Sequence, residues 1–337
     1  MELAKKLCNA YGPSGREDKI RKMIESEIGN SCQRMEVDRL GNLIAYVPAK
    51  SKDGVKKEKN TRIMFCAHMD EIGLIVTHID KKGFLRFTNI GGLSLERIVN
   101  QRIIFENGTM GFIGVETKPE TPKPPRIDNL FIDISAQEKK EAEDKVSIGD
   151  IASFYQQAVI INNRMTSKAL DDRIGCYCLI ETMKLLKENK DDLYFVFSVQ
   201  EEVGLRGART GAYAIAPDYA IAVDVTVTGD TPECRKMDVG LGKGPAIKVK
   251  DAMFLASPIV KNKLVAYAKE TDTAYQLEIL ERGTTDAAVV QIIKEGVLSG
   301  VLSIPTRYIH STNEMCDLGD VKGTIKLLLS VCEKGLS

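Results

Sequence analysis

The chain has 337 residues, of which 43% are apolar and 28% are charged, with 47 basic and 47 acidic side chains. This balance gives no argument for binding to nucleic acid or to an anionic membrane surface. No run of roughly 18 apolar residues occurs, which excludes a membrane-spanning helix, and we expect no signal peptide. We therefore expect a cytoplasmic protein, and the length favours two domains.

The eight cysteines form no pattern typical of a zinc finger or of a disulfide framework. None occurs as a Cys-x-x-Cys pair, and Cys176 and Cys178 would diverge on a helix. We expect reduced thiols that are mostly buried.

The first 70 residues combine helical and strand patterns. Ser14 and Glu17 have the spacing of a capping box, which predicts an amphipathic helix that continues to about Ile28. The other patterns here are strands at residues 35–38 and 43–47, an exposed loop at 50–60 and a buried strand at 62–67.

Residues 71–162 have a different character, with short β-type runs separated by Gly, Pro or charged turns. Their only helical pattern is at residues 136–144, and the Pro-rich residues 119–125 predict a loop or an extended segment. This block predicts a small β-barrel or sandwich inserted into another domain. Its β-type runs are residues 74–79, 84–88, 102–105, 111–115, 130–134 and 151–155.

After residue 163, helices and strands alternate again. We therefore expect residues 1–70 and 163–337 to form one α/β domain, interrupted by the inserted block. Asp317 is placed to cap the last helix. The expected helices are residues 171–188, 206–214, 258–270, 286–294 and 318–332, and the expected strands are 193–199, 220–225, 276–280 and 301–304.

Two adjacent carboxylates, Glu201 and Glu202, follow the apolar strand at residues 193–199. The carboxyl ends of such strands are where open α/β sheets bind their ligands. Consecutive side chains of an extended backbone point to opposite sides, so one carboxylate can bind a metal while the other moves protons. For an isolated Glu pair, a solvated loop start is the alternative.

Further candidate ligands occur at other predicted element ends. His68 ends a strand, and Asp70, two residues later, can hydrogen-bond its second ring nitrogen. Asp224 and His310 also follow apolar strands, and Asp171 lies just before a predicted helix. Taken singly, each has an alternative: a structural histidine, or an acid that complements a helix dipole. The helix-dipole alternative fits the next residue, Asp172, better than Asp171.

Because parallel strands end at one edge of a sheet, these residues can converge. Two histidines and several carboxylates suit a pair of divalent ions, zinc or cobalt. Asp171, Glu202 and Asp224 supply three negative charges, and a hydroxide would complete the balance for two dications. His78, inside the inserted block, has no acid two residues later and is expected to be structural.

The segments around these residues resemble the tetrahedral, or TET-type, aminopeptidases. That family includes glutamyl and deblocking aminopeptidases and proteins labelled cellulase M or endoglucanase. The resemblance covers nearly the whole chain, with the motifs in the same order. It is carried by Ala67–Gly73, Lys168–Arg173, Gln200–Ala208, Val223–Thr226 and Ile309–Ser311.

The resemblance implies the fold of dinuclear metallo-exopeptidases, in which helices flank a mixed central sheet. It also implies that the inserted block, residues 71–162, is a PDZ-like barrel used for dimerisation. Members of the family commonly form dodecamers built from dimers. We therefore expect a homo-oligomer, with a dodecamer as its specific form.

The resemblance further implies two divalent ions per subunit and a role for each candidate residue. Glu201 would be the general base, Asp70 the partner of His68, and Asp171 the bridge between the ions. The implied ligand set is His68, Asp171, Glu202, Asp224 and His310.

Two segments differ from the family pattern. Gly283–Asp286 reads Gly-Thr-Thr-Asp where relatives have Gly-Gly-Thr-Asp, and Ser311–Glu314 reads Ser-Thr-Asn-Glu where relatives often have Ser-Pro-Val-Glu. We expect the first segment to lie near the walls of a substrate pocket. The differences therefore bear on specificity, and the preferred N-terminal residue stays open.

The sequence thus predicts a metal-dependent aminopeptidase that hydrolyses N-terminal residues from peptides, with a water activated by two metal ions and Glu201 as base. A glycosidase is one alternative, and it would need two carboxylates beside a sugar and no metal. The other alternative is a non-catalytic assembly scaffold. Its inserted block would drive association.

Overall fold

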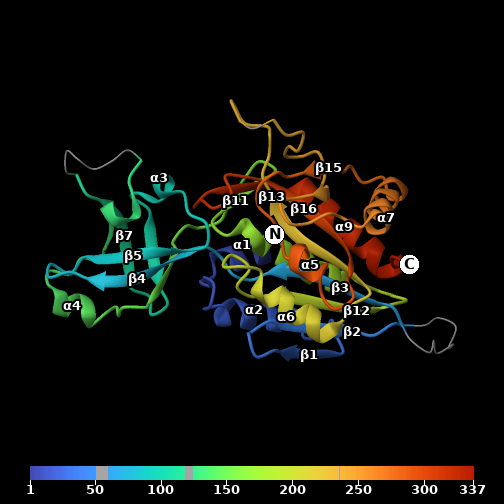
Figure 1. The fold of residues 1–337 in the computed structure, drawn as a ribbon, viewed down its shortest axis with the longest axis horizontal. Coiled ribbons are helices and arrows are strands. Elements are labelled where there is room, and N and C mark those ends of the chain that lie inside the picture. Colours follow the sequence, from blue (N-terminus) through green and yellow to red (C-terminus); the bar gives the residue numbers. More distant parts are fainter. Residues whose placement is uncertain (51–59, 118–123, 235) are drawn as a thin grey trace.

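The computed structural model describes residues 1–50, 60–117, 124–234 and 236–337. Within them, an 11-stranded sheet carries helices on both faces and adjoins a closed barrel (Figure 1). The predicted fold class, an α/β domain with a mixed sheet and an all-β barrel, is confirmed. Most of the loop predicted at residues 50–60 and of the Pro-rich segment at 119–125 lies outside the described residues.

The centre of the main sheet is a set of adjacent parallel strands in the order β12 (Asp192–Ser198), β3 (Arg62–His68), β13 (Tyr219–Thr226) and β16 (Leu298–Arg307). Antiparallel strands join on both sides, so the sheet is mixed. These further strands are β1 (Arg34–Val37), β2 (Leu43–Val47), β10 (Val159–Ile161), β11 (Arg164–Ser167), β14 (Ala246–Lys250), β15 (Gln276–Ile279) and β17 (Glu314–Asp317).

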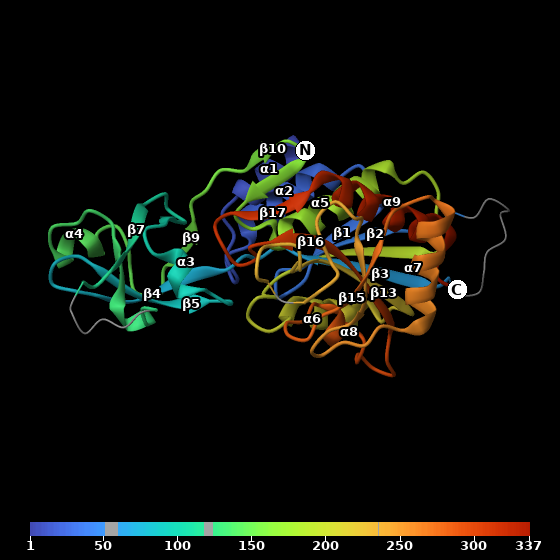
Figure 2. The same cartoon turned by 90° about the horizontal axis from the view of Figure 1, so that it is seen from above.

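Both faces of the central strands are buried, which explains why their sequences are continuous apolar runs. In β3, Phe65 belongs to the core on one face and Met64 to the core on the other. Phe65 stacks on Phe195 of β12, with 5.1 Å between ring centroids. One face is covered by α1 (Glu2–Asn9), α2 (Asp18–Ile28), α5 (Leu170–Leu185), α7 (Pro258–Glu270) and α9 (Leu318–Lys334), and the other by α6 (Arg206–Ile215) and α8 (Ala287–Val290) (Figure 2).

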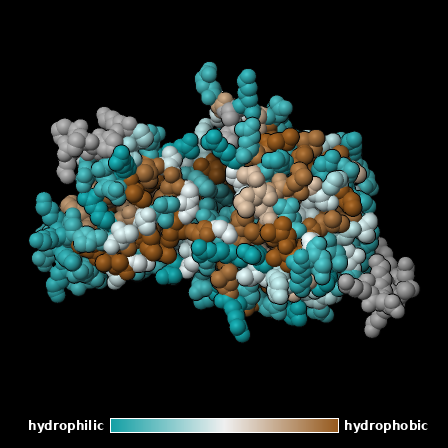
Figure 3. All heavy atoms as spheres, in the orientation of Figure 1, coloured by the Kyte–Doolittle hydropathy of each residue, from teal (hydrophilic) through white to brown (hydrophobic). Residues whose placement is uncertain are grey.

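The barrel has a hydrophobic core of its own and forms a lobe beside the larger body (Figure 3). It begins directly after β3, because only residues 69–72 separate His68 from β4. All its strands lie inside the block predicted at 71–162; the limits of that block and its role in dimerisation stay predictions. In barrel order the strands are β4 (Gly73–Ile79), β5 (Leu85–Ile90), β8 (Leu130–Asp133), β7 (Met110–Val115), β6 (Arg102–Phe105) and β9 (Ile151–Phe154), accompanied by α3 (Leu95–Ile98), η1 (Ile127–Asn129) and α4 (Lys139–Glu143).

The predicted capping box is wrong. Helix α2 begins at Asp18, and the Ser14 hydroxyl donates a hydrogen bond to Asp70 at 2.6 Å instead of capping the helix. The Glu17 carboxylate accepts from the backbone N–H groups of Gly15 and Gln200. Two buried tertiary contacts therefore replace the local pair that the spacing suggested.

Other local predictions are confirmed or need smaller changes. Asp317 caps α9 by accepting a hydrogen bond from Gly319 N at 2.8 Å. Helix α8 ends at Val290, four residues before the predicted residue 294, and β16 is longer than predicted at both ends. All eight cysteines are free thiols, and six of them are buried. Among the described residues, no helix combines the length and the apolar character that crossing a membrane requires.

Candidate metal centre

Side chains from distant parts of the chain converge at the carboxyl ends of the parallel strands. The strands that carry them, β12, β3, β13 and β16, are neighbours in the sheet, so their ends share one edge. The β3 strand leads from this edge directly into the barrel, so the site lies where the two parts of the molecule meet (Figure 1). The six residues brought together are His68, Asp171, Glu201, Glu202, Asp224 and His310.

One group, here called the first triplet, consists of His68, Glu201 and Asp224. One potential ligand atom from each residue lies within 4.8 Å of the others. His68 Nε2 is 3.9 Å from Glu201 Oε2 and also 3.9 Å from Asp224 Oδ1. His68 is almost fully buried, with 2% of its side chain exposed.

The second triplet consists of Asp171, Glu202 and His310, again within 4.8 Å of one another. His310 Nε2 lies 3.3 Å from Asp171 Oδ2 and 3.2 Å from Glu202 Oε1. The other oxygen of Asp171, Oδ1, lies 3.0 Å from His68 Nε2. Asp171 therefore presents one carboxylate oxygen to each triplet, as a bridging ligand would.

The charges of the site are mutually dependent. Burial raises the pKa of Glu201 well above its usual value; the nearby His68 opposes this rise and Asp224 adds to it. Burial alone would lower the pKa of His310, but Glu202 and Asp171 outweigh it and raise that pKa to about 12. So many buried carboxylates require nearby positive charge.

The residues fit two divalent ions. Imidazole nitrogens and carboxylate oxygens are the donors that zinc and cobalt accept. Glu202 Oε1 is buried and accepts no hydrogen bond from a described residue, although His310 is close to it. An ion beside His68 and Asp224 and a second ion beside Glu202 and His310, with Asp171 between them, would satisfy this oxygen and balance the acids.

Asp70 fixes the Glu pair by binding the backbone N–H groups of both glutamates. Its carboxylate accepts hydrogen bonds from Glu201 N at 2.9 Å, from Glu202 N at 3.1 Å and from Ser14 Oγ at 2.6 Å. The predicted contact with His68 is longer, with 3.5 Å between Asp70 Oδ1 and His68 Nδ1. The nearer acceptor for His68 Nδ1 is the Asp70 carbonyl oxygen at 3.1 Å.

Glu314 supports the second triplet in a similar way. Its Oε2 accepts from Asp171 N at 2.9 Å, and its Oε1 accepts from His310 N at 2.8 Å. Burial and the charge of Asp171 raise the pKa of Glu314 to about 8. In the sequence, Glu314 stands out only as part of a segment that differs from relatives, and no local pattern indicates this contact.

Two further acids were missed or given a lesser role. Asp172 was expected only to complement a helix dipole, but it is fully buried and accepts a hydrogen bond from His68 N at 3.2 Å. Glu17 accepts from Gln200 N at 3.2 Å, which fixes the residue before the Glu pair. Both act on the backbone beside the candidate ligands.

The two triplets lie in an open cavity of about 740 Å³. Gly283, Thr284 and Thr285 line it, in agreement with the expected place of this segment. His78 lies elsewhere: it is exposed on barrel strand β4 and belongs to neither triplet. His78 therefore has no part in the candidate metal centre, and the register shift between Val76 and His78 explains why Thr77 and His78 are both exposed.

Residues 41–327 match the M42 glutamyl aminopeptidase family. The chain belongs to this family. The resemblance to TET-type aminopeptidases read from the sequence is thereby confirmed, and the M42 match covers the residues of both triplets.

Known relatives of this M42 chain match it over nearly their full length. A protein of Acetivibrio thermocellus is 46% identical over 332 residues, which are 98% of each chain. An aminopeptidase from the archaeon Desulfurococcus kamchatkensis is 38% identical, with a TM-score of 0.94 over 99% of this chain and 94% of that one. The TET1 peptidase of Pyrococcus horikoshii is 33% identical, with a TM-score of 0.87 over 99% of each chain.

Proposed function

We propose that the protein is a metal-dependent aminopeptidase that removes N-terminal residues from peptides, using two divalent ions, zinc or cobalt. The main support is the pair of triplets that share Asp171 in an open cavity, in a chain of an aminopeptidase family. His68, Asp224, Glu202 and His310 would complete the ligand set, and Glu201, although it belongs to the first triplet, would not bind metal.

The mechanism follows from the groups around the cavity. When bound, the two ions would act as Lewis acids that polarise the scissile carbonyl and favour deprotonation of the attacking water. Glu201, buried with a raised pKa, would accept a proton from that water and deliver it to the leaving amine. Asp70 would keep Glu201 in position through its backbone N–H. A nearby carboxylate would bind the free α-amino group of the substrate.

We also propose that the protein acts in the cytoplasm as a homo-oligomer, a dodecamer built from dimers through the domain at residues 71–162. The support comes from its relatives, because the TET1 peptidase of Pyrococcus horikoshii assembles into a tetrahedron or a large octahedral shell. Sedimentation velocity of the purified protein would measure the assembled mass. A monomer at micromolar concentration would contradict this part of the proposal.

The role of Glu201 is tested by Glu201→Gln. This variant should keep both metal ions but lose about 10²–10⁴-fold in kcat, because it removes only the proton acceptor. Glu36→Gln is a matched control, since the Glu36 side chain is 53% exposed on β1. Near wild-type turnover by Glu201→Gln would show that another group is the base.

The reaction class is tested with a panel of aminoacyl-anilides, assayed with added zinc, cobalt or chelator. We expect hydrolysis that the chelator abolishes and that one of the metals restores. A β-glucan should be inert in the same assay. Hydrolysis of the glucan that resists the chelator would favour a glycosidase instead, and bound metal without turnover of any substrate would favour a scaffold.

A further inference from the structure

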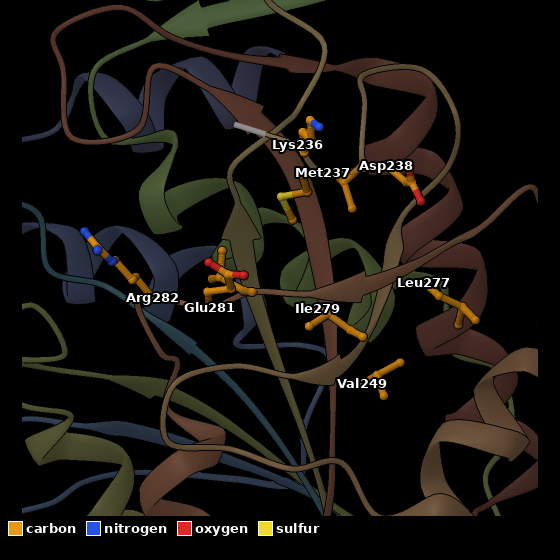
Figure 4. A pocket seen from close by; sticks show the side chains of 10 residues that line it. Lys236, Met237, Asp238, Val249, Leu277, Ile279, Glu281 and Arg282 are labelled. Carbon is orange, nitrogen blue, oxygen red and sulfur yellow. The ribbon is translucent and has the colours of Figure 1, made fainter. Parts of the chain in front are cut away.

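A groove beside β15 adjoins the cavity of the candidate metal centre. The groove has a volume of about 770 Å³, and its lining includes Val249 of β14 with Leu277 and Ile279 of β15 (Figure 4). Leu280 and Arg282 line both the groove and the metal cavity. A molecule bound at the metal centre can therefore continue into this groove.

In the described part of the chain, β15 is an edge strand that pairs with β14 alone. Gln276 N donates a hydrogen bond to the carbonyl oxygen of Pro245, at the start of this parallel pair. The backbone N–H and C=O groups of alternate residues point to the same neighbouring strand, so those of Gln276 and Glu278 point to β14. Leu277 and Ile279 consequently direct their N–H and C=O groups to the open edge.

The side chains at this edge are also accessible. Leu277 is 53% exposed and Ile279 is 63% exposed, whereas Glu278 between them is fully buried. Across the groove lie Met237 and Asp238, from the loop that faces β15 (Figure 4). Free backbone groups beside apolar side chains are the features by which sheet edges bind extended peptides.

We propose that the part of the peptide substrate beyond the cleaved bond binds as an added antiparallel strand on the open edge of β15. This inference rests on the proposed aminopeptidase function. It follows from chain direction: β15 runs toward residues 282–285, which line the metal cavity. An exopeptidase places the substrate N-terminus at the metals, so the remaining substrate runs away from them and opposite to β15.

Antiparallel pairing gives this binding mode a definite pattern. Leu277 and Ile279 each exchange two hydrogen bonds with one substrate residue, and these two substrate residues are two positions apart. The substrate side chains opposite them share the groove face of the sheet, so apolar residues bind best there. Covering the four residues of β15 takes about 13 Å of extended chain, so dipeptides cannot use the whole edge.

The inference is tested with Ile279→Pro, which removes one edge N–H while an edge strand tolerates the proline. The ratio of kcat/KM for a hexapeptide to kcat/KM for the aminoacyl-anilide with the same first residue should fall about tenfold, mainly through KM. Ile279→Ala, which keeps the N–H, should lower this ratio less. The anilide has no peptide beyond the cleaved bond and corrects for general damage to the site.

A second measurement uses the wild-type enzyme and does not depend on the folding of a variant. Hexapeptides with one N-methylated peptide bond at each successive position should show losses of kcat/KM that alternate along the chain beyond the cleaved bond. Equal losses for peptide and anilide, or losses without alternation, would overturn the inference. A lower assembled mass for Ile279→Pro would also overturn it, because the edge would then join copies of this chain. Failure of the wild type to hydrolyse any substrate would instead contradict the proposed function.

Discussion

The two triplets of the candidate metal centre differ in how they are held. His68 is the last residue of β3 and has 2% of its side chain exposed, whereas His310 lies in the loop between β16 and β17 and has 34% exposed. His310 also has a φ of 59°, an uncommon conformation for a residue with a side chain. The first triplet is thus built into the sheet, while the second depends on a loop that Glu314 fixes. We infer that an ion on the second triplet exchanges faster.

The largest effect on the difference between the two triplets is expected from a change of Asp171, which faces both of them. Asp171→Asn takes away the carboxylate that faces both histidines, so we expect loss of metal from both triplets. The fall in kcat/KM should exceed the 10–100-fold that is typical for an outer partner of a ligand, reaching about 10³-fold or more. Elemental analysis and anilide hydrolysis would measure the two effects.

Asp18→Asn is a suitable control for this change, because the Asp18 side chain is 71% exposed at the start of α2. An Asp171→Asn protein that still bound two ions with wild-type affinity would show that Asp171 bridges nothing.

Variants of the two histidines test each triplet separately. His310→Ala should leave one ion per chain on the first triplet, since His68 and its partners are unchanged. His68→Ala should lose the more firmly held ion. On the wild-type protein, a chelator time course followed by metal analysis should be biphasic, with rates about tenfold or more apart. A single phase would mean that the two triplets hold their ions as one unit.

Variants of the residues that support the ligands should have smaller and more selective effects on metal binding. Glu314→Gln leaves only one acceptor oxygen for the backbone N–H groups of Asp171 and His310, so it should weaken the second ion about 10–100-fold. Ser14→Ala removes a hydrogen bond from the Asp70 carboxylate, which accepts from both Glu201 N and Glu202 N, so it should affect both halves of the site and not the second ion alone. Metal titration of each variant would show which ion is weakened.

Ser26→Ala is the control for the serine variant, because the exposed Ser26 hydroxyl donates to the carbonyl oxygen of Met23 in its own helix. If Glu314→Gln weakened both ions equally, as Ser14→Ala is expected to do, the division of the site into two separately supported halves would be wrong.

The candidate ligands could be found in the sequence because each follows an apolar run or opens a helix. Their positions at predicted strand ends were enough to predict that they meet at one edge of a parallel sheet. Their supports could not be found in this way. Ser14 bonds a residue 56 positions away and Glu314 one 143 positions away, so no local spacing indicates either contact.

The fold could likewise be predicted only in part. The long apolar strands at the centre of the sheet were predicted, whereas β14 was not, because polar residues obscure its pattern. Lys248, in the middle of β14, is fully buried and pairs with Glu278 of β15 at 2.7 Å. A buried lysine looks like a surface residue in sequence, since only the partner strand supplies its counter-charge.

The smallest expected effect concerns the loop of the second triplet. Arg307, the last residue of β16, donates two hydrogen bonds to Asp230, at 2.9 and 2.8 Å. Burial would raise the pKa of Asp230, but Arg307 and the backbone N–H of Leu241 outweigh it and hold that pKa below its usual range. Ionised Asp230 therefore stabilises the fold above the pKa of an unfolded Asp, and the stabilisation is lost as the pH falls through the lower folded pKa.

Asp230→Asn should lower the free energy of unfolding at pH 7 by less than about 1 kcal/mol, because the pair is partly exposed. The difference from wild type should shrink as the pH falls below about 4, where the unfolded carboxylate begins to protonate. Urea unfolding at pH 7 and at pH 3 would measure it. If the variant also doubled the exchange rate of the second ion alone, Asp230 would join Glu314 as a support of the His310 loop; an effect on the first ion would contradict the separation of the two triplets.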